Sequence, residues 1–315
     1  MQKEVRAFAP ASVSNVGCGF DIFGFALDNP GDEVVIRIVD KKALVIKNIT
    51  GDNGEISKDI ENNTAGIAVK SFVNEIGFDG GLEIEIDKKM GVGTGLGSSA
   101  ASAVGSVYAL DCLLETKFDK HKLLRFAVEG EKLTSGGRTS ADNVAACLFG
   151  GFIIVRSVDD LDVINIDYPE DLYCSILYPH ILIRTSDMRK ILKTEITLDD
   201  GVKQWGNIAA LVAGLMKKDH ELIGRSLQDY IIEPTRSILI PGFNEIKKMA
   251  LENGALGSSI SGSGPSMFAL SRSRKTASDI VVAMQKITDK MGIQSDTYIS
   301  RINRIGPRIL SKNFK

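Results

Sequence analysis

The sequence predicts an α+β fold in two domains, and three observations support this prediction. Strand-like alternation and helical periodicity both occur in each half of the 315-residue chain. They interleave without the regular strand–helix–strand repeat of a doubly wound sheet, which favours α+β layers over a Rossmann fold. Each half has its own apolar runs, so a boundary is expected near Gly150 and Gly151. The expected domains are residues 1–150 and residues 151–315.

Short apolar segments in the N-terminal half are typical of strands. Leu82–Ile86 alternates with a period of two, as a half-buried strand does. Asn29-Pro30-Gly31 predicts a turn between two of the other segments. The strands expected in this half are Val5–Ala9, Ile22–Leu27, Val34–Val39, Leu44–Ile49 and Leu82–Ile86.

Helical segments alternate with these strands, and three are expected at residues 65–76, 98–114 and 120–133. Asn63 or Thr64 can cap the start of the first helix, and Gly77 can end it. Asp119 can cap the third.

The C-terminal half repeats the mixture of strands and helices. Gly254 and Gly292 follow two of its helical segments, where glycine commonly ends a helix. Strands are expected at Phe152–Arg156 and Leu172–Leu177, and helices at Val202–Met216, His220–Ile232, Asn244–Glu252 and Thr276–Met291.

Composition argues against several functional classes. The apolar fraction of 43%, the charged fraction of 25% and the net charge of −2 are ordinary for a globular protein. This balance gives no electrostatic footprint for nucleic acid or for an anionic membrane surface. Met90–Leu110 has no charged residue, but ten of its 21 positions are Gly, Ser or Thr, so we do not expect a membrane span.

The cysteines argue against a zinc site or a redox dithiol, because no two of them form a C-x-x-C pair. Their scattered placement fits a reduced, cytoplasmic compartment. Residues 1–10 contain no apolar run of the kind found in signal peptides, so no signal peptide is expected. The four cysteines are Cys18, Cys112, Cys147 and Cys174.

A glycine- and serine-rich loop separates the strand at Leu82–Ile86 from the helix that follows it. Glycines let the backbone approach an anion closely and adopt positive φ. The free amides of the first helical turn then complete a concave site for phosphate. The loop comprises Gly91, Val92, Gly93, Thr94, Gly95, Leu96, Gly97, Ser98, Ser99, Ala100 and Ala101. It predicts a phosphate-binding site.

Two common phosphate motifs do not fit this loop. A Walker A loop requires a lysine that is absent here, and Gly93, Gly95 and Ser98 break the dinucleotide pattern at its last glycine. The structural alternative is a tightly packed strand–helix turn, which the density of small residues makes less favourable. Lys88 and Lys89 precede the loop and either lend it positive charge or merely flank the strand end.

Three segments, in order along the chain, resemble the three signature motifs of the GHMP kinases. The resemblance implies a fold of two α+β domains with the active site in the cleft between them, ATP as phosphate donor, and Mg²⁺ as cofactor. It also makes a homodimer an expectation. The segments are residues 9–21 (APASVSNVGCGFD), residues 95–101 (GLGSSAA) and residues 257–266 (GSSISGSGPS).

Further segments are most similar to the branch of this family that phosphorylates the side-chain hydroxyl of L-homoserine. They include Asp142-Asn143-Val144, Thr185 with Arg189, and Glu233–Arg236 leading to Pro241-Gly242-Phe243. Two alternatives stay open at this point: another small-molecule kinase of the family, of the mevalonate or shikimate type, and a non-catalytic ligand-binding relative.

The resemblance implies roles for residues on the nucleotide side. Asn63 is expected beside the nucleotide base, and Gly91–Ala101 around the phosphates. Ser99 and Glu131 are the candidate Mg²⁺ ligands, since this ion prefers oxygen. A solvated helix carboxylate is the alternative for Glu131.

On the acceptor side, Asn15 and Asp21 are expected to hold the amino and hydroxyl groups of the substrate. Arg189 and Arg236 are expected to clamp its carboxylate, because a guanidinium matches that group bidentately. Gly262 is expected to line the cleft near the substrate; its alternative is a tight turn between strands.

Asp142, Asn143 and Arg189 are the candidate catalytic residues, with the first two in a predicted loop. Asp142 is interpreted as a general base and Asn143 as an orienting group, or the hydroxyl attacks unassisted. The chain departs from the family pattern at two positions, where Gly91 replaces a usual proline and Ser140 a frequent histidine.

Overall fold

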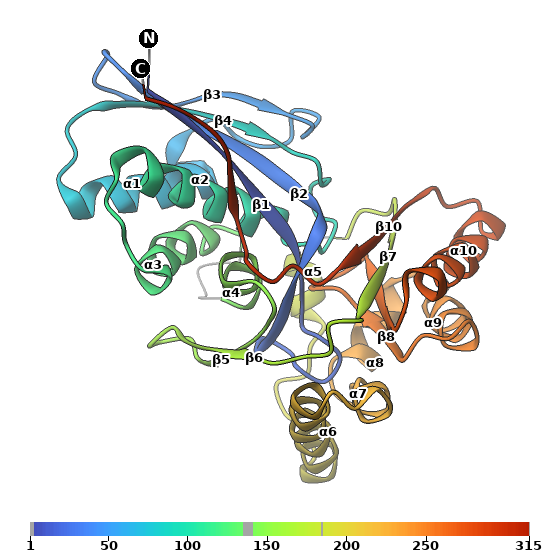
Figure 1. Ribbon diagram of the computed structural model, residues 1–315. Helices are drawn as coiled ribbons and strands as arrows, with labels where there is room; N and C mark the ends of the chain where they lie inside the picture. Colours follow the sequence, from blue (N-terminus) through green and yellow to red (C-terminus); the bar gives the residue numbers. More distant parts are fainter. Residues whose placement is uncertain (1–2, 135–140, 184, 315) are drawn as a thin grey trace.

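The computed structural model describes residues 3–134, 141–183 and 185–314, and Ser140 lies outside them. Within these residues the strands form a seven-stranded and a four-stranded sheet (Figure 1). The larger sheet has the order β11-β1-β2-β4-β3, with β5 paired to β2 and β6 paired to β5. Its strands are β1 (Glu4–Ser14), β2 (Phe23–Val39), β3 (Leu44–Thr50), β4 (Gly81–Asp87), β5 (Phe152–Ser157), β6 (Asp162–Ile166) and β11 (Arg308–Asn313).

The smaller sheet is antiparallel and has the order β10-β7-β9-β8. It consists of β7 (Tyr173–Pro179), β8 (Gly257–Ile260), β9 (Met267–Ser271) and β10 (Ser295–Arg301). Together with the helices the two sheets confirm the α+β prediction. No helix in the described part of the chain is long and apolar enough to cross a membrane.

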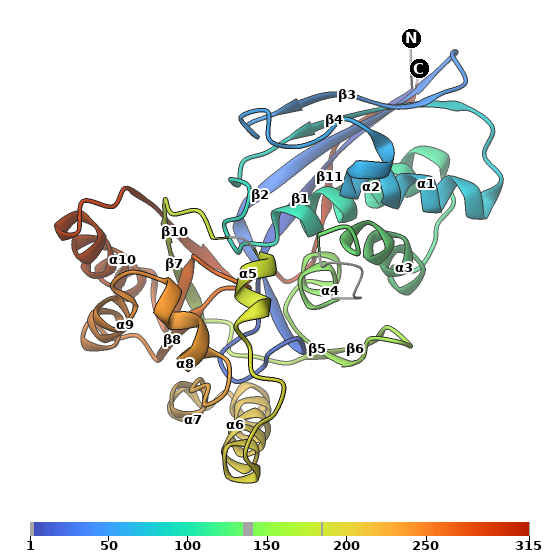
Figure 2. The same ribbon diagram turned by 180° about the vertical axis from the view of Figure 1, so that it is seen from behind.

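Helices cover one side of each sheet (Figure 2). On the larger sheet lie α1 (Thr64–Ile76), α2 (Ser98–Leu114), α3 (Lys120–Glu131) and α4 (Asp142–Phe149). With the smaller sheet lie α9 (Phe243–Glu252) and α10 (Arg274–Lys290), while α6 (Leu198–Lys217) and α7 (His220–Ser226) form a pair at the edge. Short helices are α5 (Thr185–Lys190), α8 (Glu233–Arg236), η1 (Ile60–Asn62) and η2 (Ser237–Leu239).

The predicted caps of the N-terminal helices are confirmed. The Asn63 side chain accepts from the amides of Ala65 and Gly66 at the start of α1, and Gly77 ends that helix with φ 65°. Asp119 caps α3 by accepting from the amide of Lys122. These contacts are local, so the sequence alone indicates them.

Helix α2 is buried nearly all round rather than on one face, because it packs between the sheet and α1, α3 and α4. Small residues permit this close approach. A side chain at Gly105 would lie 3.0 Å from Val34 and 3.2 Å from Ala9. This packing explains why the uncharged segment is rich in glycine, alanine and serine. It also fixes the start of α2, and with it the glycine loop, against the sheet.

The turn predicted at Asn29-Pro30-Gly31 is wrong. Residues on both sides of it belong to one strand, β2, and both pair antiparallel with β1. Pro10 faces Gly31, whereas Ser12 faces Ala26, so the intervening residues form a bulge in a strand that does not reverse. The sequence Asn29-Pro30-Gly31, which is typical of a turn, therefore marks a bulge within β2.

Strand β5, which follows Gly150 and Gly151, pairs with β2 in the larger sheet, and β6 pairs with β5. The last strand, β11, returns to pair with β1. Placing the domain boundary at residues 150 and 151 stays a prediction. The helix predicted at His220–Ile232 ends earlier, at Ser226, and Asp142 begins a helix instead of lying in a loop.

Candidate active site

A cavity of about 460 Å³ contains most of the residues singled out from the sequence. Its lining joins the glycine loop, the starts of α1, α2 and α4, the end of α3, and the arginines of α5 and α8. The predicted site residues that line it are Asn15, Asp21, Asn63, Val92, Gly93, Thr94, Gly95, Gly97, Ser98, Ser99, Glu131, Asp142, Asn143, Arg189, Arg236 and Gly262.

Four predicted residues of the loop do not line the cavity. The side chains of Leu96, Ala100 and Ala101 are buried in the hydrophobic core. Gly91 lies beside Thr94, where a Cβ would be 3.2 Å from the threonine methyl. These residues therefore shape the loop, and only their backbone atoms could contact a ligand.

The glycine loop has the geometry expected of a phosphate site. Gly93, Gly95 and Gly97 all have positive φ, between 67° and 80°. Gly97 precedes α2, and no side chain caps this helix. The amides at the start of α2 therefore lack a side-chain partner at the wall of the cavity, where they can bind an anion.

Substitution of Gly97 tests this loop, with Gly93 as the matched control. Both residues have φ near 70°, but a Cβ at Gly97 would lie 2.1 Å from Ser12 Oγ, whereas nothing lies within 4 Å at Gly93. Each alanine costs about 1–2 kcal/mol for the left-handed backbone. We expect Gly97→Ala to weaken nucleotide binding about tenfold more than Gly93→Ala. Calorimetric titration with ATP measures this, and equal losses would contradict the proposed crowding.

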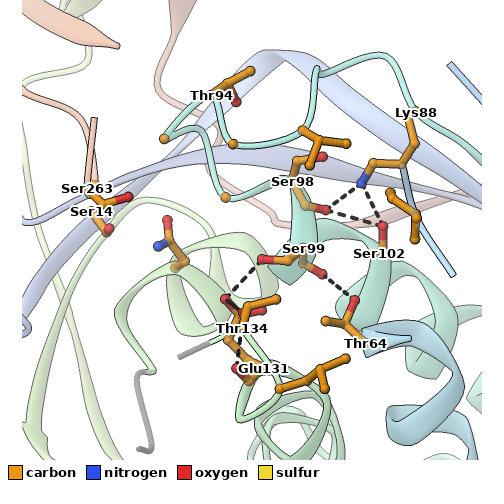
Figure 3. A pocket seen from close by; sticks show the side chains of 18 of the residues that line it. Ser14, Thr64, Lys88, Thr94, Ser98, Ser99, Ser102, Glu131, Thr134 and Ser263 are labelled. Carbon is orange, nitrogen blue, oxygen red and sulfur yellow. Dashed lines mark hydrogen bonds between the residues drawn. The ribbon is translucent and has the colours of Figure 1, made fainter. Parts of the chain in front are cut away.

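A buried ion pair anchors both ends of the loop. Lys88 Nζ contacts Asp32 and donates to the Ser98 carbonyl oxygen and to Ser102 Oγ, both at 2.7 Å (Figure 3). Asp32 also accepts from the amides of Lys89 and Met90 and from Ser98 Oγ. The contacts of Lys88 therefore stabilise the loop, and Asp32 largely balances its positive charge. The position of Lys88 before the loop is visible in the sequence, whereas no local pattern indicates Asp32.

Ser99 and Glu131, the candidate metal ligands, lie together in the cavity. Ser99 Oγ donates to Glu131 Oε1 at 2.9 Å, and Thr134 Oγ1 donates to the same oxygen at 2.9 Å (Figure 3). Glu131 is 8% exposed, so the alternative of a solvated carboxylate is wrong. Burial raises the pKa of its carboxyl to about 7, although the two hydrogen bonds lower it.

These oxygens fit Mg²⁺, which binds few protein groups and keeps water or phosphate oxygens as its other ligands. Among the described residues no group of three or more His, Cys, Asp or Glu side chains could hold a metal. A hydroxyl and a carboxylate beside a phosphate loop match an ion that arrives with a nucleotide.

The raised pKa of Glu131 predicts how the stability of the metal-free protein depends on pH. The folded state binds this proton more tightly than the unfolded state, so stability falls as pH rises from about 4.5 to about 7. The loss is roughly 3 kcal/mol and is absent in Glu131→Gln. Urea unfolding in a chelator at pH 5 and pH 8 measures the difference. An equal change in the free energy of unfolding between pH 5 and pH 8 in wild type and in Glu131→Gln would contradict the prediction.

The opposite end of the cavity holds two arginines and a carboxylate. Arg189 Nη2 lies 3.2 Å from Asp21 Oδ1, and Arg189 Nε is buried without a hydrogen-bond partner among the described residues. Arg236 is 2% exposed; it donates to the carbonyl oxygen of Gly262 at 3.1 Å and stacks on Phe20. Burial lowers its pKa to about 10, against the opposing effect of Asp21.

Asn15 organises the loop that carries Asp21. Its side-chain oxygen accepts from the Asp21 amide at 2.8 Å, and its Nδ2 donates to the Gly262 carbonyl at 2.8 Å. Asn15 and Asp21 both have positive φ, and Gly262 has φ 58° between β8 and β9. The N-terminal and C-terminal signature segments therefore meet at this end, and the turn expected at Gly262 lines the site.

Asp142 and Asn143 lie in the first turn of α4, between the two ends of the cavity. Asp142 is 1% exposed. Its charge adds to the burial that raises the pKa of Glu131, and it opposes the larger effect of burial that lowers the pKa of Arg236. Asn143 Oδ1 accepts from Ser12 Oγ at 2.8 Å. This arrangement places a buried carboxylate where the two halves of the site meet.

A residue that the sequence reading missed supports the arginine end from behind. Gln204 Nε2 donates to the Cys18 carbonyl and to Asp229 Oδ1, both at 2.9 Å. The Asp229 carboxylate accepts hydrogen bonds from three backbone amides, those of Ile231, Ile232 and Glu233, where α8 begins. Helix α8 ends at Arg236. Gln204 thus ties the Asp21 loop to the segment that positions Arg236. No local sequence signal distinguishes it.

Comparison with known proteins agrees with this geometry. Residues 63–151 match the family model for the GHMP kinases N terminal domain, and residues 211–289 match that for the GHMP kinases C terminal. A homoserine kinase from Chloroherpeton thalassium is 46% identical over 319 residues, covering 98% of this chain and 100% of the relative.

Solved structures show the same relationship. A crystal structure of homoserine kinase from Cytophaga hutchinsonii superposes with a TM-score of 0.95 at 53% identity, covering 98% of this chain and 97% of that one. A mevalonate kinase structure reaches a TM-score of 0.73 at 14% identity, covering 96% and 99%, which shows a shared fold alone.

Proposed function

The chain belongs to the GHMP kinase family, and we propose that its cleft transfers the γ-phosphate of ATP to the side-chain hydroxyl of L-homoserine, giving O-phospho-L-homoserine and ADP. One observation supports this most directly. A single cavity joins a phosphate loop and a hydroxyl–carboxylate pair at one end to two arginines and an aspartate at the other. The second end matches the carboxylate and ammonium groups of an amino acid.

The nucleotide end binds and orients ATP. The amides of Gly95, Gly97 and the first turn of α2 face the phosphates, and Asn63 lies in the part of the lining expected beside the base. Ser99 and Glu131 would hold Mg²⁺, which when bound neutralises charge on the phosphates. Lys88 and Asp32 keep the loop in place.

The acceptor end holds L-homoserine by its ionic groups. Arg189 and Arg236 bind the carboxylate, and Asn15 and Asp21 hold the amino and hydroxyl groups, with Asp21 as the partner of the ammonium. The homoserine hydroxyl oxygen then forms a bond to the γ-phosphorus while the bond to the bridging oxygen of ADP breaks. Phosphoryl transfer depends mainly on such positioning and on charge stabilisation.

The hydroxyl must lose its proton in this step, and Asp142 is the proposed acceptor, with Asn143 orienting the hydroxyl. Asp142 is buried at the meeting point of the two ends, which suits a base that contacts the attacking oxygen. Asp142→Asn keeps the shape and removes the base. A kcat unchanged within about threefold would show that the hydroxyl attacks unassisted.

A coupled assay of ADP release tests the function as a whole. We expect Mg²⁺-dependent turnover with L-homoserine, and none above background with mevalonate or shikimate, which lack an ammonium group for Asp21. Turnover with one of the latter and not with homoserine would replace the proposed acceptor. Nucleotide binding without turnover on any acceptor would indicate a non-catalytic relative.

The expected location in a reducing cytoplasm stays a prediction. All four cysteines are free thiols in the structure, as that location would require.

A further inference from the structure

Ser14, the last residue of β1, is a polar residue of the cavity wall whose side chain makes no hydrogen bond. It is 1% exposed, and its Oγ is buried without a hydrogen-bond partner among the described residues. Ser98 and Ser99 also line the cavity, but each donates to a carboxylate of the chain. Because a buried hydroxyl without a partner destabilises the folded protein, such groups are rare and call for a partner from elsewhere.

The pairing of β1 with β2 fixes the side of the sheet on which Ser14 lies. Ser14 is paired with Gly24, and residues opposite each other in an antiparallel pair share one face. A Cβ at Gly24 would lie 2.7 Å from the Asp142 carbonyl oxygen. Ser12, two residues before Ser14 and thus on the same face, donates to Asn143 Oδ1. The Ser14 side chain is therefore on the face that the first turn of α4 covers.

Ser14 also adjoins the turn at Gly262 and the phosphate loop. Its carbonyl oxygen accepts from the Gly262 amide at 2.9 Å. A Cβ at Gly262 would lie 3.4 Å from Ser14 Oγ and 3.0 Å from the Gly95 carbonyl oxygen, so glycine leaves open the space beside both. Figure 3 shows Ser14 apart from Ser99 and Glu131, on another side of the cavity. Ser14 thus lies where the phosphate loop meets the acceptor end.

A phosphoryl group that moves from ATP to the acceptor passes this position. In the proposed reaction it leaves the loop that contains Gly95 and reaches the acceptor oxygen beside Asp142. Its oxygens carry negative charge and need hydrogen-bond donors. A serine hydroxyl is such a donor, and no hydrogen bond fixes the rotamer of Ser14. Rotation about the Cα–Cβ bond of Ser14 can therefore direct its hydroxyl into the cavity.

The attacking oxygen of the acceptor is the other group expected near Ser14, and it is the poorer partner. A hydrogen bond donated to this oxygen would hold the electron pair that has to form the new bond to phosphorus. A charged phosphoryl oxygen instead accepts a charge-assisted hydrogen bond, which is stronger than a neutral one. The chemistry therefore favours the phosphoryl group as the partner of Ser14.

We propose that Ser14 is a further catalytic residue, whose hydroxyl donates to a non-bridging oxygen of the phosphoryl group during its transfer. The proposal rests on the proposed phosphoryl transfer, but not on the identity of the acceptor. The acceptor oxygen forms a bond to phosphorus while the bond from phosphorus to the ADP oxygen breaks. Ser14 keeps its proton throughout and contributes only the hydrogen bond.

The kinetics of Ser14→Ala, with Ser175→Ala as the matched control, test this contact. Ser175 is equally buried but does not line the cavity, and its Oγ donates to the Ala277 carbonyl oxygen at 2.9 Å. We expect Ser14→Ala to lower kcat roughly ten- to a hundredfold. The KM for homoserine and the dissociation constant for ATP should stay within about threefold, and Ser175→Ala should keep kcat within about twofold.

Two kinetic results would overturn the proposal. One is a kcat of Ser14→Ala within about threefold of wild type. The other is a higher KM for the acceptor with an unchanged kcat, which would place the contact on the acceptor and not on the phosphoryl group. If wild type phosphorylates another acceptor and not homoserine, the proposed function fails but the same comparison with that acceptor still tests Ser14.

Binding of a transition-state mimic gives a readout that needs no turnover. Planar aluminium fluoride bound with ADP stands in for the transferred phosphoryl group. Calorimetric titration with ADP and Mg²⁺ should give equal affinities in wild type, Ser14→Ala and Ser175→Ala. Aluminium fluoride should then raise the affinity about tenfold less in Ser14→Ala than in the other two proteins. An equal gain in all three would show that Ser14 does not contact the phosphoryl group.

Urea unfolding separates a catalytic hydroxyl from a structural one. Ser14→Ala removes a buried group that has no partner, so the midpoint of unfolding should stay unchanged or rise. Ser175→Ala removes a hydrogen bond and should lower the midpoint. A fall in Ser14→Ala as large as that in Ser175→Ala would mean that the fold itself satisfies the Ser14 hydroxyl, and it would refute the proposal.

Discussion

Arg236→Ala is expected to reduce kcat/KM for L-homoserine by roughly 30-fold to several thousand-fold, corresponding to about 2–5 kcal/mol for a buried charged contact. Arg236 is almost fully buried, so in the proposed complex its guanidinium would meet the substrate carboxylate with little competition from water. The dissociation constant for ATP should change by less than about threefold, because the nucleotide contacts lie at the other end.

The alanine variant alone is ambiguous, because Arg236 also donates to the Gly262 carbonyl and stacks on Phe20. Arg236→Lys keeps the charge but loses the planar fork, so an intermediate loss of about tenfold is expected. Arg225→Ala, at an exposed arginine at the end of α7, is the matched control and should leave both constants unchanged. Equal losses for homoserine and ATP in Arg236→Ala would contradict a carboxylate contact.

Glu131→Gln is expected to lower kcat at least about 100-fold at a fixed Mg²⁺ concentration, since removing even an outer-shell partner of a metal costs ten- to a hundredfold. The amide keeps the shape of the carboxylate and can still accept from Ser99 and Thr134. Folding is therefore expected to survive, and the metal-free variant should be as stable as wild type or more stable above pH 7.

The response to Mg²⁺ separates a ligand from a structural residue. If Glu131 holds the ion, excess Mg²⁺ should restore part of the lost rate. If it is only structural, the loss should not depend on the metal concentration. Glu129→Gln, two residues away on the exposed side of α3 and paired with Lys132, is the matched control and should keep kcat within about twofold.

Local features of the N-terminal half could be predicted well. The cap at Asn63, the stop at Gly77 and the glycine loop before α2 all depend on residues within a few positions of one another. The helix α4 and the strands β8 to β11 are not among the elements expected from the sequence, because their segments show little periodicity. Strand β11 exists because β1 supplies its hydrogen bonds, and β1 lies at the other end of the chain.

The site shows the same division between local and distant information. The family resemblance makes Ser99 and Glu131 the candidate Mg²⁺ ligands, and the structure brings them within hydrogen-bond distance. That Glu131 is buried could not be read from the sequence, because its neighbours Glu129 and Lys132 suggest a solvated face. The burial, and hence the raised pKa of Glu131, follows from the packing of α3 against α2.

The sequence by itself determined the glycine loop, the order of the signature segments and the residue types of the candidate site, because glycine positions reflect local backbone conformation and charged side chains reflect local chemistry. Tertiary structure alone decided which partners those residues have. Asp32 meets Lys88 from 56 positions away, Arg189 meets Asp21 from 168, and Gln204 meets Cys18 from 186. Such contacts arise when sheets and helices pack, so no pattern of neighbouring residues indicates them.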